Sequence, residues 1–148
     1  MKKILLFIIL FLSFNMSVLA EEEHDFRLTN WGMSPEQVMQ QEKLTLSHDD
    51  TLANDVYVLI YTVNILGKEG IVEYGFKNRA LREASLIFYR KSFSSDNEYA
   101  FLFEALKQSL IDSYGESNDN SWQLSRTTIY LKNYGDQFSV YYFDRGNI

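Results

Sequence analysis

The stretch from Val56 to Tyr89, VYVLIYTVNILGKEGIVEYGFKNRALREASLIFY, decides the fold. It contains three runs rich in β-branched and aromatic residues, each of strand length: 56–63, 71–76 and 81–89. Glycine and polar residues at 66–70 separate the first two runs. Asn78 tolerates the positive φ of a tight turn between the second and third. Because short turns join antiparallel strands, the stretch predicts a three-stranded meander.

A helix is predicted before this meander. Ser34 is a favourable N-cap, and Pro35 suits the first helical position, where a missing N–H costs nothing. Gln37 completes a capping box with Ser34, so we expect a helix from Pro35 to about Lys43. The polar segment that follows, Ser47-His48-Asp49-Asp50, is expected to be a loop.

A second helix and a hairpin are predicted after the meander. Ser95 and Glu98 form another capping box, and Gly115 fits the C-terminal cap. Between them an apolar stripe recurs at three- and four-residue steps, which is typical of a helix face: Tyr99, Leu102, Phe103, Leu106 and Leu110. Residues 121–124 are expected to form a short strand, and 127–132 and 138–143 a hairpin.

The element order predicts an α+β domain. We expect an antiparallel sheet of five to six strands with two main helices on one face, in the order α-β-β-β-α-β-β(-β). The domain is expected to span residues 21–148 as a single unit, long enough for a real core. Its acidic start, residues 21–25, is expected to be flexible.

Residues Met1 to Ala20 have the layout of a secretory signal, with a basic start, an apolar run and a small residue at the cut. The apolar run is nine residues long, whereas a membrane-spanning helix needs about 20. We therefore expect cleavage after Ala20 and a periplasmic or secreted protein. The sequence has no cysteine, so we expect neither disulfides nor a lipid anchor, and no membrane anchor after cleavage.

Charge narrows the class of partner. Without the signal segment, 12 basic side chains face 20 acidic ones, a formal charge of −8. Nucleic-acid binding depends on basic side chains that neutralise phosphates. We therefore expect no nucleic-acid partner, and no attraction to anionic membrane surfaces.

The sequence contains no pattern that we assign to catalysis, to a metal or to a nucleotide. His48 and Asp49 resemble half of an acid–base or metal site, but no third group of defined spacing accompanies them. Glu73 and Glu83 on adjacent strands could form an acid–base pair, although polar positions alternating on a half-solvated sheet explain them more simply. We expect no cofactor, no metal and no enzyme. The alternative is a small periplasmic hydrolase or ligand-binding protein that uses these carboxylates or the His48 loop.

Tyrosine is the more informative residue type. If Ile129 and Leu131 face the helices, Tyr130 lies on the opposite, open sheet face. Tyrosine is enriched at recognition surfaces, because it offers a large contact area at low entropic cost. The alternative is ordinary packing by residues that favour strands. The candidate binding residues are Tyr57, Tyr61, Tyr89, Tyr130 and Tyr141.

The string GMSPEQV, from Gly32 to Val38, resembles the helix start of the BamE family, small envelope lipoproteins with a helix-then-meander fold. Tandem units of that kind build the β-lactamase-inhibitor-protein fold, in which the concave sheet face grips a partner enzyme. The chain also resembles a group of small exported bacterial proteins of unknown function. These share a WGMS-type first helix, a Tyr-Gly helix end, here Tyr114-Gly115, and a downstream Trp, here Trp122.

These observations lead to one expected function. We expect a non-enzymatic periplasmic binding module, which recognises a protein or envelope component through the open face of its sheet. Neither the residues nor the resemblance predicts which partner it binds.

Overall fold

The computed structural model describes residues 24–52 and 56–147. The predicted signal segment, Met1 to Ala20, lies outside the described residues. The strands are β1 Thr45–Leu52, β2 Val56–Ile65, β3 Lys68–Lys77, β4 Ala80–Tyr89, β5 Ser121–Gln123, β6 Thr127–Asn133 and β7 Gln137–Asp144. The helices are α2 Pro35–Gln41 and α3 Asp96–Tyr114, with short 3-10 turns η2 Arg90–Ser92 and η3 Arg145–Asn147.

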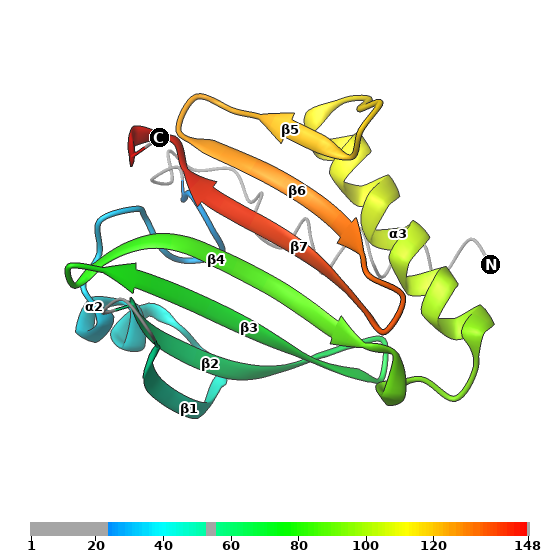
Figure 1. The fold of residues 1–148 in the computed structure, drawn as a ribbon, viewed down its shortest axis with the longest axis horizontal. Helices are drawn as coiled ribbons and strands as arrows, with labels where there is room; N and C mark the ends of the chain where they lie inside the picture. Colours follow the sequence, from blue (N-terminus) through cyan, green and yellow to red (C-terminus); the bar gives the residue numbers. More distant parts are fainter. Residues whose placement is uncertain (1–23, 53–55, 148) are drawn as a thin grey trace.

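All strands join one antiparallel sheet of seven strands in the order β1-β2-β3-β4-β7-β6-β5 (Figure 1). The predicted α+β class and the antiparallel sheet are therefore confirmed, although the sheet is larger than the five to six strands expected. The pairing of β4 with β7 joins the first four strands to the last three. Both hairpins of the predicted meander form, and Asn78 and Arg79 take positive φ angles of 52° and 60° in the second.

The extra strand is β1, and the prediction of a loop at Ser47–Asp50 was wrong. β1 pairs along its length with β2, with a bulge between Leu46 and His48. Every residue of β1 is exposed, because it is an edge strand that neither of the described helices covers. An edge strand needs only backbone hydrogen bonds and tolerates charge on its surface, so the apolar alternation that reveals a strand is missing here.

Both helices cover the same face of the sheet, as predicted. Val38 of α2 is fully buried in one cluster with Leu59 and Tyr74. Leu102 of α3 packs in a second cluster with Phe88. Strand register places these three strand residues on the same side of the sheet, and Figure 1 shows the two helices behind it.

Cap chemistry sets the helix ends. The predicted capping box at α2 is present, because Ser34 Oγ accepts a hydrogen bond from the Gln37 N–H at 3.4 Å and Gln37 Oε1 accepts from the Ser34 N–H at 2.9 Å. At α3 half of the predicted box forms. Ser95 Oγ accepts from the Glu98 N–H at 3.3 Å, whereas the Glu98 carboxylate accepts from Ser94 and from Lys68 of β3. Helix α3 ends at Gly115, as predicted.

Helix α2 stops at Gln41, before the predicted end at Lys43, because Glu42 leaves the helix with extended backbone and turns inward. Its carboxylate accepts hydrogen bonds from Arg27 Nε at 2.9 Å and from the Tyr74 hydroxyl at 2.5 Å. The carboxylate is fully buried, so it ties the start of the domain and α2 to β3.

The segment before α2 is held in place by polar contacts. Asp25, expected in the flexible start, accepts a hydrogen bond from the Trp31 N–H at 2.8 Å and pairs with Arg126 at 3.0 Å. Trp31 Nε1 donates to Thr127 Oγ1 at 2.9 Å across 96 residues of sequence. Among the residues that the structure describes, no helix is long and apolar enough to cross a membrane.

Candidate functional site

The candidate site is the sheet surface opposite the two helices, which we call the open face. Side chains alternate along each strand, so the register fixes which residues share this face. Tyr130 of β6 lies directly opposite Tyr141 of β7. Ile129 and Leu131, the neighbours of Tyr130, are buried in the helix-side core. The predicted placement of Tyr130 and Tyr141 on the open face is therefore correct.

Three aromatic rings meet on the open face, and we call Tyr130, Tyr141 and Phe143 the aromatic cluster. The rings of Tyr130 and Phe143 meet edge to face with centroids 6.0 Å apart. Those of Tyr141 and Phe143 are nearly parallel, at 19° and 6.1 Å. All three side chains are half-buried, so the rings support one another and still present surface.

The other three candidate tyrosines lie elsewhere. Tyr57 and Tyr61 sit on the helix-covered side of β2, against the expectation. The Tyr57 hydroxyl donates to Asp49 Oδ2 at 2.8 Å, and the Tyr61 ring is buried against that of Tyr74. β2 is apolar on both faces, so alternation alone could not decide which tyrosines faced outward. Tyr89 does lie on the open face, half-buried opposite Gln137.

Two carboxylates lie beside the aromatic cluster, and we call Glu73 and Glu83 the carboxylate pair. Glu73 of β3 is half-buried, with Ile60 and Ser85 as its cross-strand neighbours. Burial and the nearby charge of Glu83 raise the pKa of Glu73. Within the described part of the chain, neither carboxylate takes part in an ion pair.

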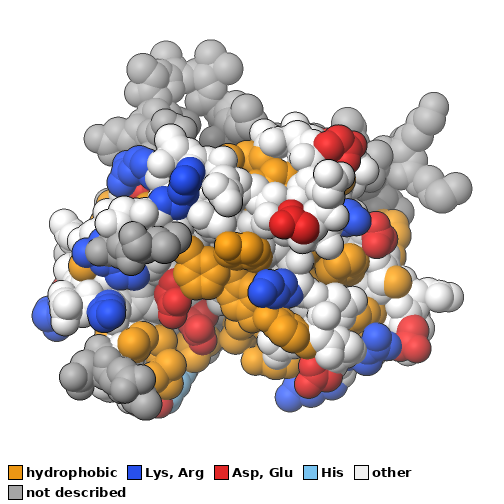
Figure 2. Space-filling view, turned by 45° about the horizontal axis from the view of Figure 1, so that its top comes forward, with side chains coloured by type: hydrophobic (Ala, Val, Ile, Leu, Met, Phe, Trp, Pro, Cys, Tyr) orange, Lys and Arg blue, Asp and Glu red, His pale blue; other side chains and the backbone are white. Residues whose placement is uncertain are grey.

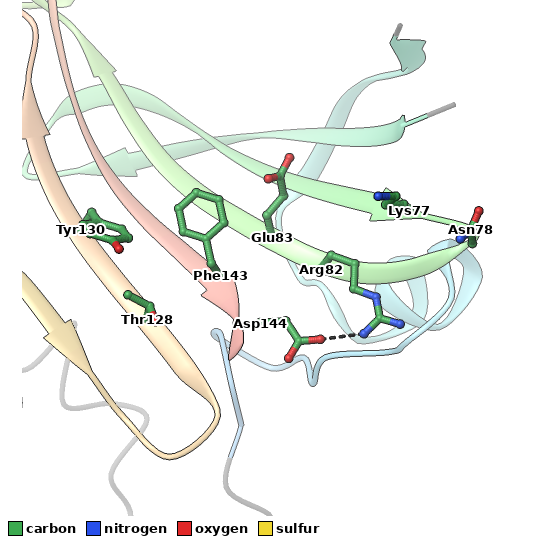
Figure 3. A pocket seen from close by; sticks show the side chains of 8 residues that line it. All are labelled: Lys77, Asn78, Arg82, Glu83, Thr128, Tyr130, Phe143 and Asp144. Atoms are coloured by element: carbon green, nitrogen blue, oxygen red, sulfur yellow. Dashed lines mark hydrogen bonds and ion pairs between the residues drawn. The ribbon is translucent and has the colours of Figure 1, made fainter. Parts of the chain in front are cut away.

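A depression of about 560 Å³ lies at the end of the open face where β4 begins and β7 ends. It is lined by Lys77, Asn78, Arg82, Glu83, Thr128, Tyr130, Phe143 and Asp144. Arg82 Nη1 pairs with Asp144 Oδ2 at 2.6 Å. Figure 3 shows the Arg82 side chain turned toward Asp144, whereas Glu83 points away from both, beside the Phe143 ring. The Glu83 carboxylate therefore lies on the open face, directed away from Arg82 (Figure 3).

The middle of the open face is shielded although both described helices lie on the other side. Ile87 and Ser85 of β4 and Ser139 of β7 are at most 7% exposed. Figure 2 shows hydrophobic side chains gathered across the middle of this surface, with acidic side chains next to them.

The His48 segment does not assemble a site of its own. His48 is exposed on the edge strand β1, and its Nε2 lies 3.8 Å from Asp50 Oδ2. In residues 24–52 and 56–147, no group of three His, Cys, Asp or Glu side chains is placed to hold a metal ion.

Sequence reasoning missed Phe143 and Tyr134 as members of this surface. Phe143 ended a predicted strand, and its two-residue offset from Tyr141 was the available signal. Tyr134 lies in the connection between β6 and β7, and its interaction with Tyr141, together with burial, raises its pKa. Its side chain is 55% exposed, so it extends the aromatic surface toward the turn.

Comparison of the chain with protein-family models, with curated proteins and with solved structures gives no match.

Proposed function

We propose that this chain is a non-enzymatic binding module of the periplasm, which recognises a protein or envelope component through its open face. The observation that carries the proposal is the aromatic cluster. Its three half-buried rings stand together on a sheet surface opposite both described helices. The secretory layout of the first 20 residues supports the compartment.

A partner can bind to such a surface at a low cost in side-chain entropy. Tyr130 and Phe143 already restrain each other, so ordering them against a partner costs little further side-chain entropy. Tyrosine adds a hydroxyl at the edge of a large apolar area, which suits contact with a mixed protein surface. The likeness of Gly32 to Val38 to the BamE-type helix start agrees with this role, because related tandem units grip a partner with a sheet face.

The test is capture of a partner by a double variant. Tyr130→Ala with Tyr141→Ala should lose capture from an envelope extract of the cells that make the protein, after crosslinking. Phe101→Ala is the matched control, because Phe101 is 53% exposed on α3, away from the open face. Capture that survives in a double variant with native circular dichroism would remove the open face as the binding surface.

A second candidate function rests on the carboxylate pair. Glu73 has a raised pKa beside a second carboxylate, which is the arrangement that acid–base catalysis uses. A small hydrolase built this way would turn over a substrate, and either Glu73→Gln or Glu83→Gln would abolish that turnover. If the protein turns over no substrate in panels of esters and glycosides, and the tyrosine variants lose capture of the partner, the binding module is favoured.

A further inference from the structure

Three carboxylates in the described part of the chain are buried, and each has an arginine partner. The buried Glu42 pairs with Arg27, Asp25 with Arg126 and Asp144 with Arg82. Each of these three acidic side chains is at most 10% exposed. A buried carboxylate costs free energy unless a cation or donors compensate it, and in these three cases arginine does so.

Glu73 is the exception. It is half-buried, its cross-strand neighbours are Ile60 and Ser85, and the charge that acts on it is the like charge of Glu83. Within the described residues no lysine or arginine pairs with either member of the carboxylate pair. The open face therefore carries two carboxylates that no cation of the described residues pairs with.

The rows of the sheet place this charge next to the aromatic rings. One row across the open face runs Glu73, Ser85, Tyr141 and Tyr130. Ser85 is buried, whereas Glu73 and Tyr141 on either side of it are half-buried and reach the surface. The backbones of Glu73 and Tyr141 are two strand spacings apart, about 10 Å, so one guanidinium at the surface can contact both side chains.

The adjacent row borders these side chains on one side. It runs Gly75, Glu83 and Phe143. Gly75 has no side chain, and Glu83 lies over it, since a Cβ there would stand 2.7 Å from Glu83 Oε1. Both carboxylates thus border the same strip of the face, with Tyr141 and Phe143 along its other side.

We propose that the partner is a protein segment that presents an arginine, whose guanidinium binds at the surface of the open face between the carboxylate pair and the rings of Tyr141 and Phe143. This inference rests on the proposed function and names its partner chemistry. A guanidinium is planar, stacks on aromatic rings and forms paired hydrogen bonds with carboxylates, whereas an ammonium is a compact, strongly hydrated charge.

The protein already contains the same arrangement once. Arg90 Cζ lies 4.4 Å from the centre of the Tyr99 ring, and its Nη1 pairs with Asp96. Two lysines also lie on the open face. Lys132 lies 5.3 Å from the Tyr130 ring, and Lys77 lines the depression with Glu83, but neither forms an ion pair with the carboxylate pair.

The test is an NMR titration of the full chain, in the form that the expressing cells retain, with N-acetyl-arginine methylamide. The matched probe is the citrulline analogue, which has the same shape without the charge, and the third probe is the lysine analogue. We expect the amide signals of Glu73, Ser85 and Tyr141 to shift and saturate with arginine, and at least tenfold weaker binding of the other two. Equal binding of citrulline or of lysine would overturn the assignment to arginine.

Two charge variants complete the test. Glu73→Gln with Glu83→Gln should weaken arginine binding at least tenfold. Glu104→Gln with Glu116→Gln removes the same charge from exposed positions outside the open face and should leave binding unchanged. If Tyr130→Ala with Tyr141→Ala abolishes capture of the cellular partner while the carboxylate variant retains both capture and arginine binding, the binding module stands and the arginine falls. If neither variant loses capture, both proposals fall.

Discussion

The side chain of Glu83 on β4 lies across Gly75 on β3, so that a Cβ added at Gly75 would stand 2.5 Å from Glu83 Cγ. This contact holds one carboxylate of the pair flat on the open face. A methyl group at Gly75 must displace Glu83, because real Cβ atoms do not approach other atoms so closely.

Gly75→Ala should therefore move Glu83 and weaken arginine binding, at a stability cost of about 1 kcal/mol. The matched change is Gly70→Ala on the same strand, where the Cβ would meet the buried ring of Phe88 at 2.6 Å and the Ile87 carbonyl oxygen at 2.8 Å. Neither can turn away, so we expect a loss of about 2–3 kcal/mol there. Urea unfolding measures both, and an equal cost at the two positions would contradict this account of Glu83.

Glu42→Gln should destabilise the domain by about 3 kcal/mol, because it leaves the guanidinium of Arg27 without its charge partner. Burial raises the pKa of Glu42, but hydrogen bonds from Arg27 and Tyr74 outweigh it, so the net pKa shift is downward. A lowered pKa in the folded state means stability that is present above the ordinary value of 4.5 and lost as pH falls through the folded pKa. The free energy of unfolding, measured by urea unfolding at a series of pH values, should therefore fall less steeply with decreasing pH in the variant than in the parent.

Glu73→Gln should change the free energy of unfolding in the opposite direction to Glu42→Gln at neutral pH. Burial and the charge of Glu83 raise the pKa of Glu73 above 4.5, so its favourable contribution is complete below that value and is lost as pH rises through the folded pKa. We expect the variant to be more stable than the parent by about 0.5–1 kcal/mol at neutral pH. The difference should vanish below pH 4.5, and a variant that is less stable at neutral pH would show that Glu73 has an internal partner.

Two buried tyrosine hydroxyls should respond differently to removal. Tyr74→Phe removes the hydrogen bond that the Tyr74 hydroxyl donates to the Glu42 carboxylate. This change should lower the free energy of unfolding by about 1.5–3 kcal/mol. The Tyr61 hydroxyl has no hydrogen-bond partner among the described residues. Tyr61→Phe should therefore raise the free energy of unfolding by about 0.5–1 kcal/mol, since a buried unpaired hydroxyl is itself a cost. Thermal unfolding of the two variants compares them directly.

The local chemistry of the chain was readable from sequence where a strong signal marks an element. The capping residue Ser34, the turn at Asn78 and the strand that carries Tyr130 all appear as predicted. β1 could not be recognised, since an edge strand needs no apolar face. Tyr57 and Tyr61 were misplaced because the run from Val56 to Tyr61 is apolar on both faces of β2, so its pattern has no preferred period.

The sequence predicted only part of the candidate site, for a different reason. Tyr130 and Tyr141 lie on one predicted hairpin, so alternation sufficed to put them on one face. The neighbourhood of Glu73, Ser85 and Tyr141 depends on the pairing of β4 with β7. That pairing joins strands separated by a whole helix, and no short-range pattern encodes which edge meets which.

The β4–β7 pairing also decides when the recognition strip exists. The carboxylates belong to the first meander and the rings to the final hairpin, so each half of the chain carries one component only. A nascent or partly folded chain has the acidic half without the aromatic half. The strip is complete only once β4 has paired with β7, and a partner that requires both components distinguishes chains with this pairing from chains without it.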